Sequence, residues 1–69
     1  MKIYNIEAVN MGKDQQEIAE CVMEHLADRE FKTEQEFSSM EGFLVEMACH
    51  ALEWNSVPQT GGLIVEWEK

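Results

Sequence analysis

The chain has 69 residues, which is enough for a single small domain over residues 1–69 and too few for two. Five Lys and Arg stand against fourteen Asp and Glu, and the resulting formal net charge of −9 disfavours direct binding to nucleic acid or to an anionic membrane. The same charge favours a protein partner with a basic surface. Hydrophobic residues make up 45% of the chain, a share that excludes intrinsic disorder.

The opening residues, MKIYNIEAV, lack the charged region, apolar region and cleavage site of a signal peptide. No stretch approaches the roughly 18 apolar residues that a membrane-spanning helix needs. Two cysteines in a chain without an export signal are expected to be free thiols rather than a disulfide. We therefore predict a cytoplasmic protein with no membrane partner.

A strand is predicted over residues 2–9, KIYNIEAV, because apolar residues recur at every second position. Tyr4, Ile6 and Ala8 share one face of this strand, and that apolar face is expected to be the buried one. Residues 10–13, NMGK, follow as a turn.

The first predicted helix begins at Asp14 as its N-cap, with Glu17 three residues later in a capping-box arrangement. The helix is expected to end near Ala27 or Asp28. At about 100° per residue, one broad side collects the apolar residues Ile18, Ala19, Val22, Met23 and Leu26. The opposite side collects the acidic residues Glu17, Glu20, Glu24 and Asp28.

A second helix is predicted after the connection at residues 28–32, because Thr33 and Glu36 form the clearest capping box in the chain. Apolar residues then recur at spacings of three and four, which predicts a buried seam of Phe37, Met40, Leu44, Met47, Ala51 and Trp54. Phe43, Ala48 and Leu52 widen the seam, and Val45 and Cys49 extend it. The polar strip is narrow: Gly42, Glu46, His50 and Glu53. A helix this apolar is expected to be covered on more than one side.

The last predicted strand covers residues 63–68, LIVEWE, after a loop at residues 55–62 that contains Pro58 and two glycines. Leu63, Val65 and Trp67 share one face of this strand. Ile64 falls on the other face.

These elements predict an α+β fold in the order β-α-α-β. Two helices joined by a short connection form an antiparallel hairpin, which is expected to pack on a two-stranded antiparallel sheet. Such a sheet is marginal, and both its edges are open. A homodimer would complete it by building a four-stranded sheet, or by burying the surplus apolar face of the second helix.

Two Cys/His pairs raise the question of a metal site. Cys21 and His25, four residues apart, lie on one side of the first predicted helix and could supply half of a zinc site. Cys49 and His50 are consecutive, so they point about 100° apart on a helix and cannot complete it. We therefore predict no metal and no other cofactor. The cysteines are expected to act as small hydrophobes, with His25 at the edge of the core and His50 in solvent.

Catalytic residues are not predicted either. A reactive cysteine needs an electropositive setting, but Glu20, Glu24 and Glu46 surround the two thiols in the sequence. The two adjacent glycines at 61–62 precede a strand and carry no following Lys, so they are not a phosphate-binding loop. A chain this short is also not expected to form a deep cleft. The sequence therefore indicates a protein that is not an enzyme.

The candidate binding residues are acidic and concentrated at the two predicted helices. On a helix, residues three and four apart lie about 5–6 Å from each other, so the first helix presents a row of like charges. Such repulsion costs a few tenths of a kcal/mol per pair, which a small domain tolerates more readily if the charges are used. The predicted partner-binding set is Asp14, Glu17, Glu20, Glu24, Asp28, Glu34 and Glu36.

The leading hypothesis is an inhibitor or modulator that docks a basic protein surface through this acidic face. A nucleic-acid-handling complex is the natural target, as for the small acidic proteins by which phages inhibit host nucleases, polymerases and CRISPR complexes. That comparison is one of protein class and not of sequence. The alternative hypothesis is a homodimeric structural or regulatory accessory protein whose acidity serves only solubility.

Overall fold

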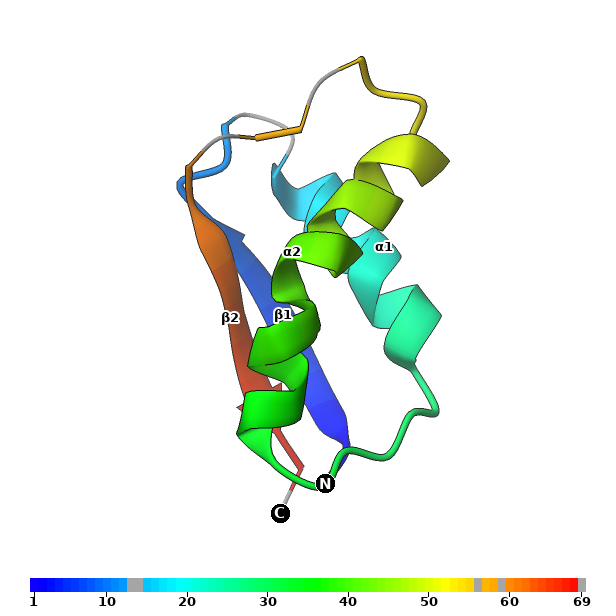
Figure 1. The fold of residues 1–69 in the computed structure, drawn as a ribbon, viewed down its shortest axis with the longest axis vertical. Helices are drawn as coiled ribbons and strands as arrows, with labels where there is room; N and C mark the ends of the chain where they lie inside the picture. The colour runs from blue at the N-terminus through cyan, green and yellow to red at the C-terminus, as the bar shows by residue number, and fades with distance from the viewer. Residues whose placement is uncertain (13–14, 56, 59, 69) are drawn as a thin grey trace.

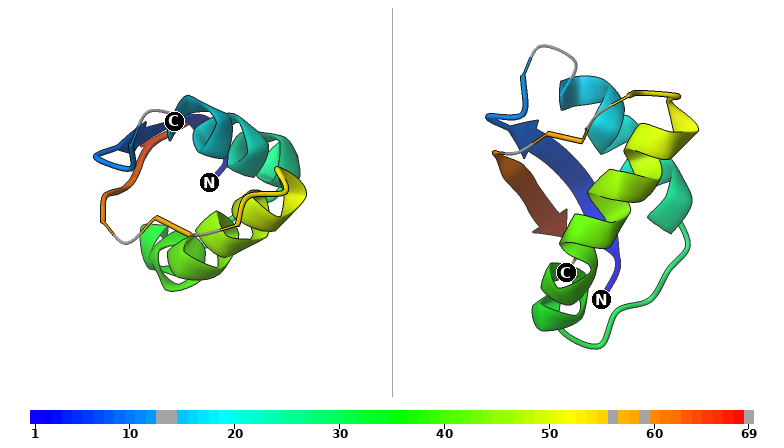
Figure 2. Two further views of the ribbon diagram at one scale, coloured as in Figure 1. Left: turned by 90° about the horizontal axis from the view of Figure 1, so that it is seen from above. Right: turned by 45° about the horizontal axis from the view of Figure 1, so that its top comes forward.

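The computed structural model describes residues 1–12, 15–55, 57–58 and 60–68. It contains the strand β1 (Ile3–Val9), the helices α1 (Gln15–Leu26) and α2 (Glu34–Ala51), and the strand β2 (Gly62–Trp67). The strands pair antiparallel, and the two helices form a hairpin over one face of the sheet (Figures 1 and 2). The predicted α+β fold and its β-α-α-β order are thus confirmed. Neither helix is long and apolar enough, over the described residues, to cross a membrane.

The two strands are in register except near the start of β1. Ile6 lies opposite Val65, but between Ile3 and Asn5 the register shifts, as in a β-bulge. The extra residue reverses the alternation of side chains, so Ile3 packs against the core while 67% of Tyr4 is exposed. The prediction that Tyr4 belongs to the buried face is therefore wrong, because strict alternation of faces assumes a strand without a bulge.

Helix α1 packs on β1 with the apolar side that its sequence predicts. Its buried residues are Ile18, Ala19, Val22 and Leu26, and its acidic side faces solvent. The helix ends at Leu26, slightly earlier than expected. The predicted N-cap, Asp14, lies outside the described residues.

The buried side of α2 overlaps the predicted seam and is rotated toward its predicted extension. Its buried residues are Phe37, Leu44, Val45, Ala48 and Cys49. Met40 and Met47 are half-buried, whereas Ala51 is exposed and Phe43 is 68% exposed. The predicted seam is confirmed at Phe37 and Leu44 and wrong at Ala51. A helix that is apolar on most sides offers several overlapping stripes, and the pattern does not show which one is buried. The narrow polar strip of Gly42, Glu46, His50 and Glu53 does face solvent.

The C-terminus of α2 comes earlier than the seam suggested, at Ala51. Glu53 adopts a left-handed conformation with φ of 60°. Its N–H donates to His50 O at 3.1 Å, and the N–H of Trp54 donates to Cys49 O at 2.9 Å, a Schellman arrangement. Trp54 therefore lies beyond the helix, where it packs half-buried against the core.

An aromatic cluster joins the inter-helix connection, α2 and β2 at one end of the molecule. Phe31, Phe37 and Trp67 make three edge-on ring contacts with centroid distances of 5.5–6.1 Å. The backbone of Phe31 also pairs with Met1, each N donating to the other's carbonyl at 2.7 Å. Phe31 is only 1% exposed, although sequence reasoning treated residues 28–32 as a simple connection.

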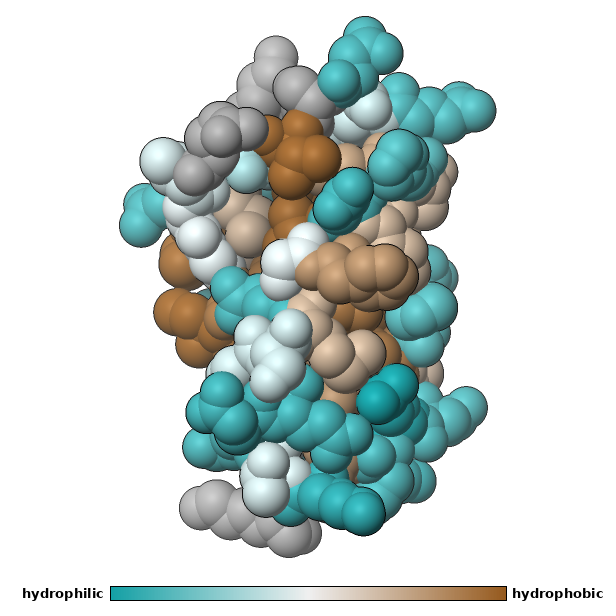
Figure 3. Space-filling view, viewed as in Figure 1, coloured by the Kyte–Doolittle hydropathy of each residue, from teal (hydrophilic) through white to brown (hydrophobic). Residues whose placement is uncertain are grey.

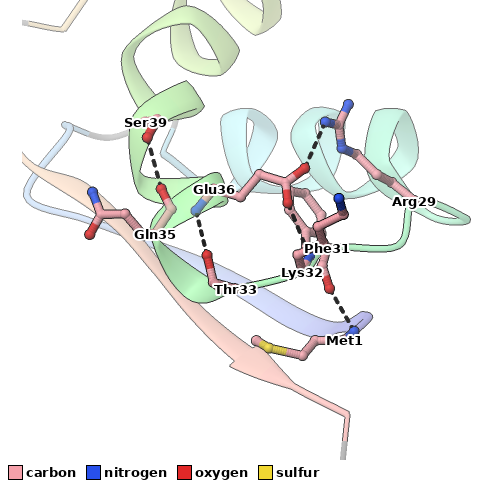
Figure 4. A network of polar contacts seen from close by, with 8 residues as sticks. All are labelled: Met1, Arg29, Phe31, Lys32, Thr33, Gln35, Glu36 and Ser39. Carbon is pink, nitrogen blue, oxygen red and sulfur yellow. Dashed lines mark hydrogen bonds and ion pairs between the residues drawn. The ribbon is translucent and has the colours of Figure 1, made fainter.

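The N-terminus of α2 carries the polar network drawn in Figure 4. Thr33 is the N-cap, and its Oγ1 accepts the N–H of Glu36 at 3.4 Å. The Glu36 carboxylate accepts the N–H of Lys32 at 3.0 Å, instead of that of Thr33 as in a capping box, and pairs with Arg29 at 3.2 Å. The predicted helix start is confirmed, with the reciprocal bond displaced by one residue.

Two glycines give opposite predictions for stability. Gly42 lies in α2 with open space around it, so Gly42→Ala should raise the free energy of unfolding by about 0.5–1 kcal/mol.

Gly61 has φ of +94°, and a Cβ there would lie 2.4 Å from Val9 O. Gly61→Ala should lower the free energy of unfolding by at least about 2 kcal/mol. Urea unfolding followed by circular dichroism measures both, and equal effects of the two substitutions would contradict the described backbone.

The network around Glu36 predicts a pH dependence. The hydrogen bond from Lys32, and then the contact with Arg29, lower the pKa of Glu36 below its ordinary value of 4.5. A carboxyl group whose pKa is lower in the folded state stabilises the fold above its unfolded pKa and loses this effect as pH falls through the folded pKa. Glu36→Gln should therefore lower Tm near neutral pH, and the difference from the unsubstituted protein should shrink as the pH falls below 4.5 and close once it is below the lowered pKa of Glu36.

The matched control for this prediction is Glu20→Gln, which neutralises an exposed glutamate outside the network. Its Tm difference from the unsubstituted protein should change less between neutral and acid pH. Thermal melts of the three proteins across this pH range make the comparison. A Glu36→Gln difference that stays constant with pH would show that the carboxylate does not stabilise the helix start.

Candidate protein-binding surface

The acidic side of α1 forms one wall of a hollow between the two helices. Glu17, Glu20 and Glu24 are exposed and successive members lie three and four residues apart. Together with Cys21 of α1 and with Ala51 and Leu52 beside it, they line a hollow of about 420 Å³. Carboxylates beside apolar side chains suit a Lys or Arg side chain, which can pack its aliphatic stem on the apolar groups and present its charge to the carboxylates.

The remaining predicted binding residues do not join this surface as a group. Asp28 is exposed in the turn after α1, and Asp14 lies outside the described residues. Glu34 is exposed but lines a separate hollow between α2 and β2. Glu36 takes part in the N-cap network. We therefore define the acidic α1 face by three residues, Glu17, Glu20 and Glu24.

Sequence reasoning missed the apolar part of this surface. Ala51 was expected in the buried seam of the second helix, and Leu52 beside it. The signal lay in the apolar excess of that helix, which exceeds what one buried side needs. The pattern alone could not show which of these residues would be left beside the acidic face.

The described positive charges gather at the opposite end of the molecule from the first turn of α1. The α-amino group of Met1 pairs with Glu30 at 2.7 Å, and Arg29 pairs with Glu36. Lys2 and Lys32 contribute to the electrostatics of the same two carboxylates. Over the described residues, no ion pair reaches the acidic α1 face.

The cysteines and histidines differ in their burial. Cys49 is buried, and burial raises the pKa of its thiol, as do, to a smaller extent, the nearby Cys21 and Glu46. A raised pKa disfavours the nucleophilic thiolate. His50 is exposed as expected, but His25 is exposed too and not at the edge of the core. Within the described part of the chain, no group of three or more His, Cys, Asp or Glu could hold a metal ion.

Apolar side chains also reach the surface. Tyr4 and Ile64, 53% exposed, lie on the sheet face that the helices leave uncovered, and Phe43 projects from α2. Figure 3 shows hydrophobic areas over α2 and beside β2, set among hydrophilic side chains. The molecule thus exposes both an acidic surface and scattered apolar ones.

Comparison of the chain with protein-family models, with curated proteins and with solved structures finds no match.

Proposed function

We propose that this protein is a non-enzymatic inhibitor or modulator that acts in the cytoplasm by docking its acidic α1 face onto a basic surface of another protein. The observation that carries the proposal is the hollow that three exposed carboxylates line together with Ala51 and Leu52, with no ion pair to those carboxylates among the described residues. In a partner's basic surface, each Lys or Arg would find both an ionic and an apolar contact there.

The target class that we propose is a nucleic-acid-handling protein or complex. A basic surface that accepts the phosphates of DNA or RNA is complementary in charge to a row of carboxylates. Occupying that surface would block nucleic acid by competition, as a DNA mimic does. An anti-host protein of the phage type, such as an inhibitor of CRISPR complexes, is the most concrete form of this proposal.

The proposal is tested by affinity capture from nuclease-treated bacterial lysate with mass-spectrometric identification. The expected result is a nucleic-acid-binding protein that is released by raised salt and by added duplex DNA. Replacing Glu17, Glu20 and Glu24 together by Gln should reduce the captured amount at least about tenfold, because three interfacial charge pairs are lost.

The matched control replaces Glu7, Glu66 and Glu68 by Gln, which removes the same charge from exposed positions on the strands. This variant should capture the target to within about threefold of the unsubstituted protein. Equal losses in both variants would mean that net charge alone drives capture. Capture that survives the α1 substitutions, or that duplex DNA leaves unchanged, would overturn the proposal.

A second candidate is the homodimeric structural or regulatory accessory, and the uncovered sheet face favours it. Tyr4 and Ile64 are exposed there, and a copy of the chain could cover them. Dimerisation predicts that Tm rises with protein concentration and that Ile64→Lys abolishes this rise. Sedimentation equilibrium of both proteins is the direct check. A monomer at every concentration, with a constant Tm, would exclude this candidate.

A further inference from the structure

The outer edge of β2 is open and lies apart from the acidic α1 face. Within the described residues, β2 pairs with β1 alone. Figures 1 and 2 show it at the margin of the sheet with no other segment along its outer edge. The corresponding edge of β1 is partly occupied, because Met1, just before that strand, pairs with Phe31.

The backbone of β2 presents hydrogen-bonding groups at this edge. Glu68 donates its N–H to Lys2 O at 2.8 Å, so this amide points toward the chain leading into β1. Successive residues of a strand point their backbone groups to opposite sides. The N–H and C=O groups of Leu63, Val65 and Trp67 therefore point outward, where an added strand could pair with them.

The side chains of the same three residues line a hollow beneath α2. This hollow has a volume of about 220 Å³, and α2 contributes Glu34, Ser38 and Glu41 to its wall. A strand edge beside a hollow roofed by a helix is the arrangement in which an extended peptide gains main-chain hydrogen bonds and places alternate side chains in pockets.

The carboxylates that line the hollow favour a basic side chain as its occupant. Glu34 and Glu41 have no ion pair among the described residues, and the Oε2 of Glu41 lies 3.4 Å from where a Cβ on Gly62 would be. One carboxylate thus stands directly beside the first residue of β2. A Lys or Arg side chain entering from an added strand would meet it.

We propose that β2 accepts an extended protein segment with Lys or Arg at alternate positions, which adds to the sheet as a third strand. Its backbone pairs with Leu63, Val65 and Trp67, and its basic side chains enter the hollow toward Glu34 and Glu41. A second copy of this chain fits the edge less well, because each copy carries −9 and pairing of two β2 strands would bring their glutamates together.

The probe is an end-blocked, fluorescently labelled peptide of alternating lysine and valine, with binding measured by fluorescence anisotropy. Two further peptides carry N-methyl groups, one on every lysine amide and the other on every valine amide. Since these two sets of amides face opposite edges of an added strand, one methylated peptide should bind at least about tenfold more weakly than the other. Equal affinity of the two would overturn the proposal, because simple electrostatic attraction does not distinguish the edges.

Protein variants locate the contact. Glu34→Lys combined with Glu41→Lys should weaken binding at least about tenfold, whereas the same change at Glu17 and Glu20 should weaken it no more than about threefold at roughly 0.15 M salt. Equal losses would overturn the proposal. Circular dichroism confirms that each variant, changed only at residues that are not fully buried, retains the fold.

Amide hydrogen exchange gives a readout that does not depend on substitution. The peptide should slow exchange at Leu63, Val65 and Trp67, whose amides point outward from the sheet. Protection confined to α1 would overturn the proposal. Slow exchange at these three amides without peptide, increasing with protein concentration, would also overturn it, because a second copy would then occupy the edge.

Discussion

The contact among Phe31, Phe37 and Trp67 holds the connection, α2 and β2 together, and the arrangement of the molecule depends on it. Helix α1 lies close against β1 through small and branched side chains, whereas α2 reaches β2 through the larger ring of Phe37. This spacing leaves the hollow beneath α2 beside the edge of β2. The aromatic cluster thus stabilises one end of the fold and shapes a surface at the same time.

Separation of charge is the second organising feature. The described cations Lys2, Arg29 and Lys32 lie near Glu30 and Glu36, where they stabilise the start of α2 and the chain's first residue. The carboxylates on α1 and along the hollow under α2 are left without such partners among the described residues. Since repulsion among Glu17, Glu20 and Glu24 on α1 costs some stability, a basic partner at that face would relieve it as well as bind.

Sequence patterns predicted the order of the elements and both faces of α1, and they placed Leu63, Val65 and Trp67 on one face of β2, because each of those segments has one clear period. The patterns failed where the same residues were compatible with more than one buried face. The bulge at Tyr4 adds one residue to the alternation, and the apolar excess of α2 left open whether Phe43, at the margin of the predicted seam, would be buried; it is exposed. The burial of Phe31 was overlooked because a single aromatic residue in a connection forms no periodic pattern. The spacing of the glutamates predicted the acidic α1 face. The hollow beside it depends on how α1 packs against α2, which the spacing does not show.

Zero-length carbodiimide crosslinking of the captured complex tests the central claim most directly, since this reagent joins carboxylates only to amines in contact with them. The reagent should join Glu17, Glu20 or Glu24 to lysines of the partner that lie within its nucleic-acid-binding surface. Peptide mapping by mass spectrometry identifies the joined residues. Crosslinks restricted to other glutamates, with none from α1, would contradict the account of how this protein binds.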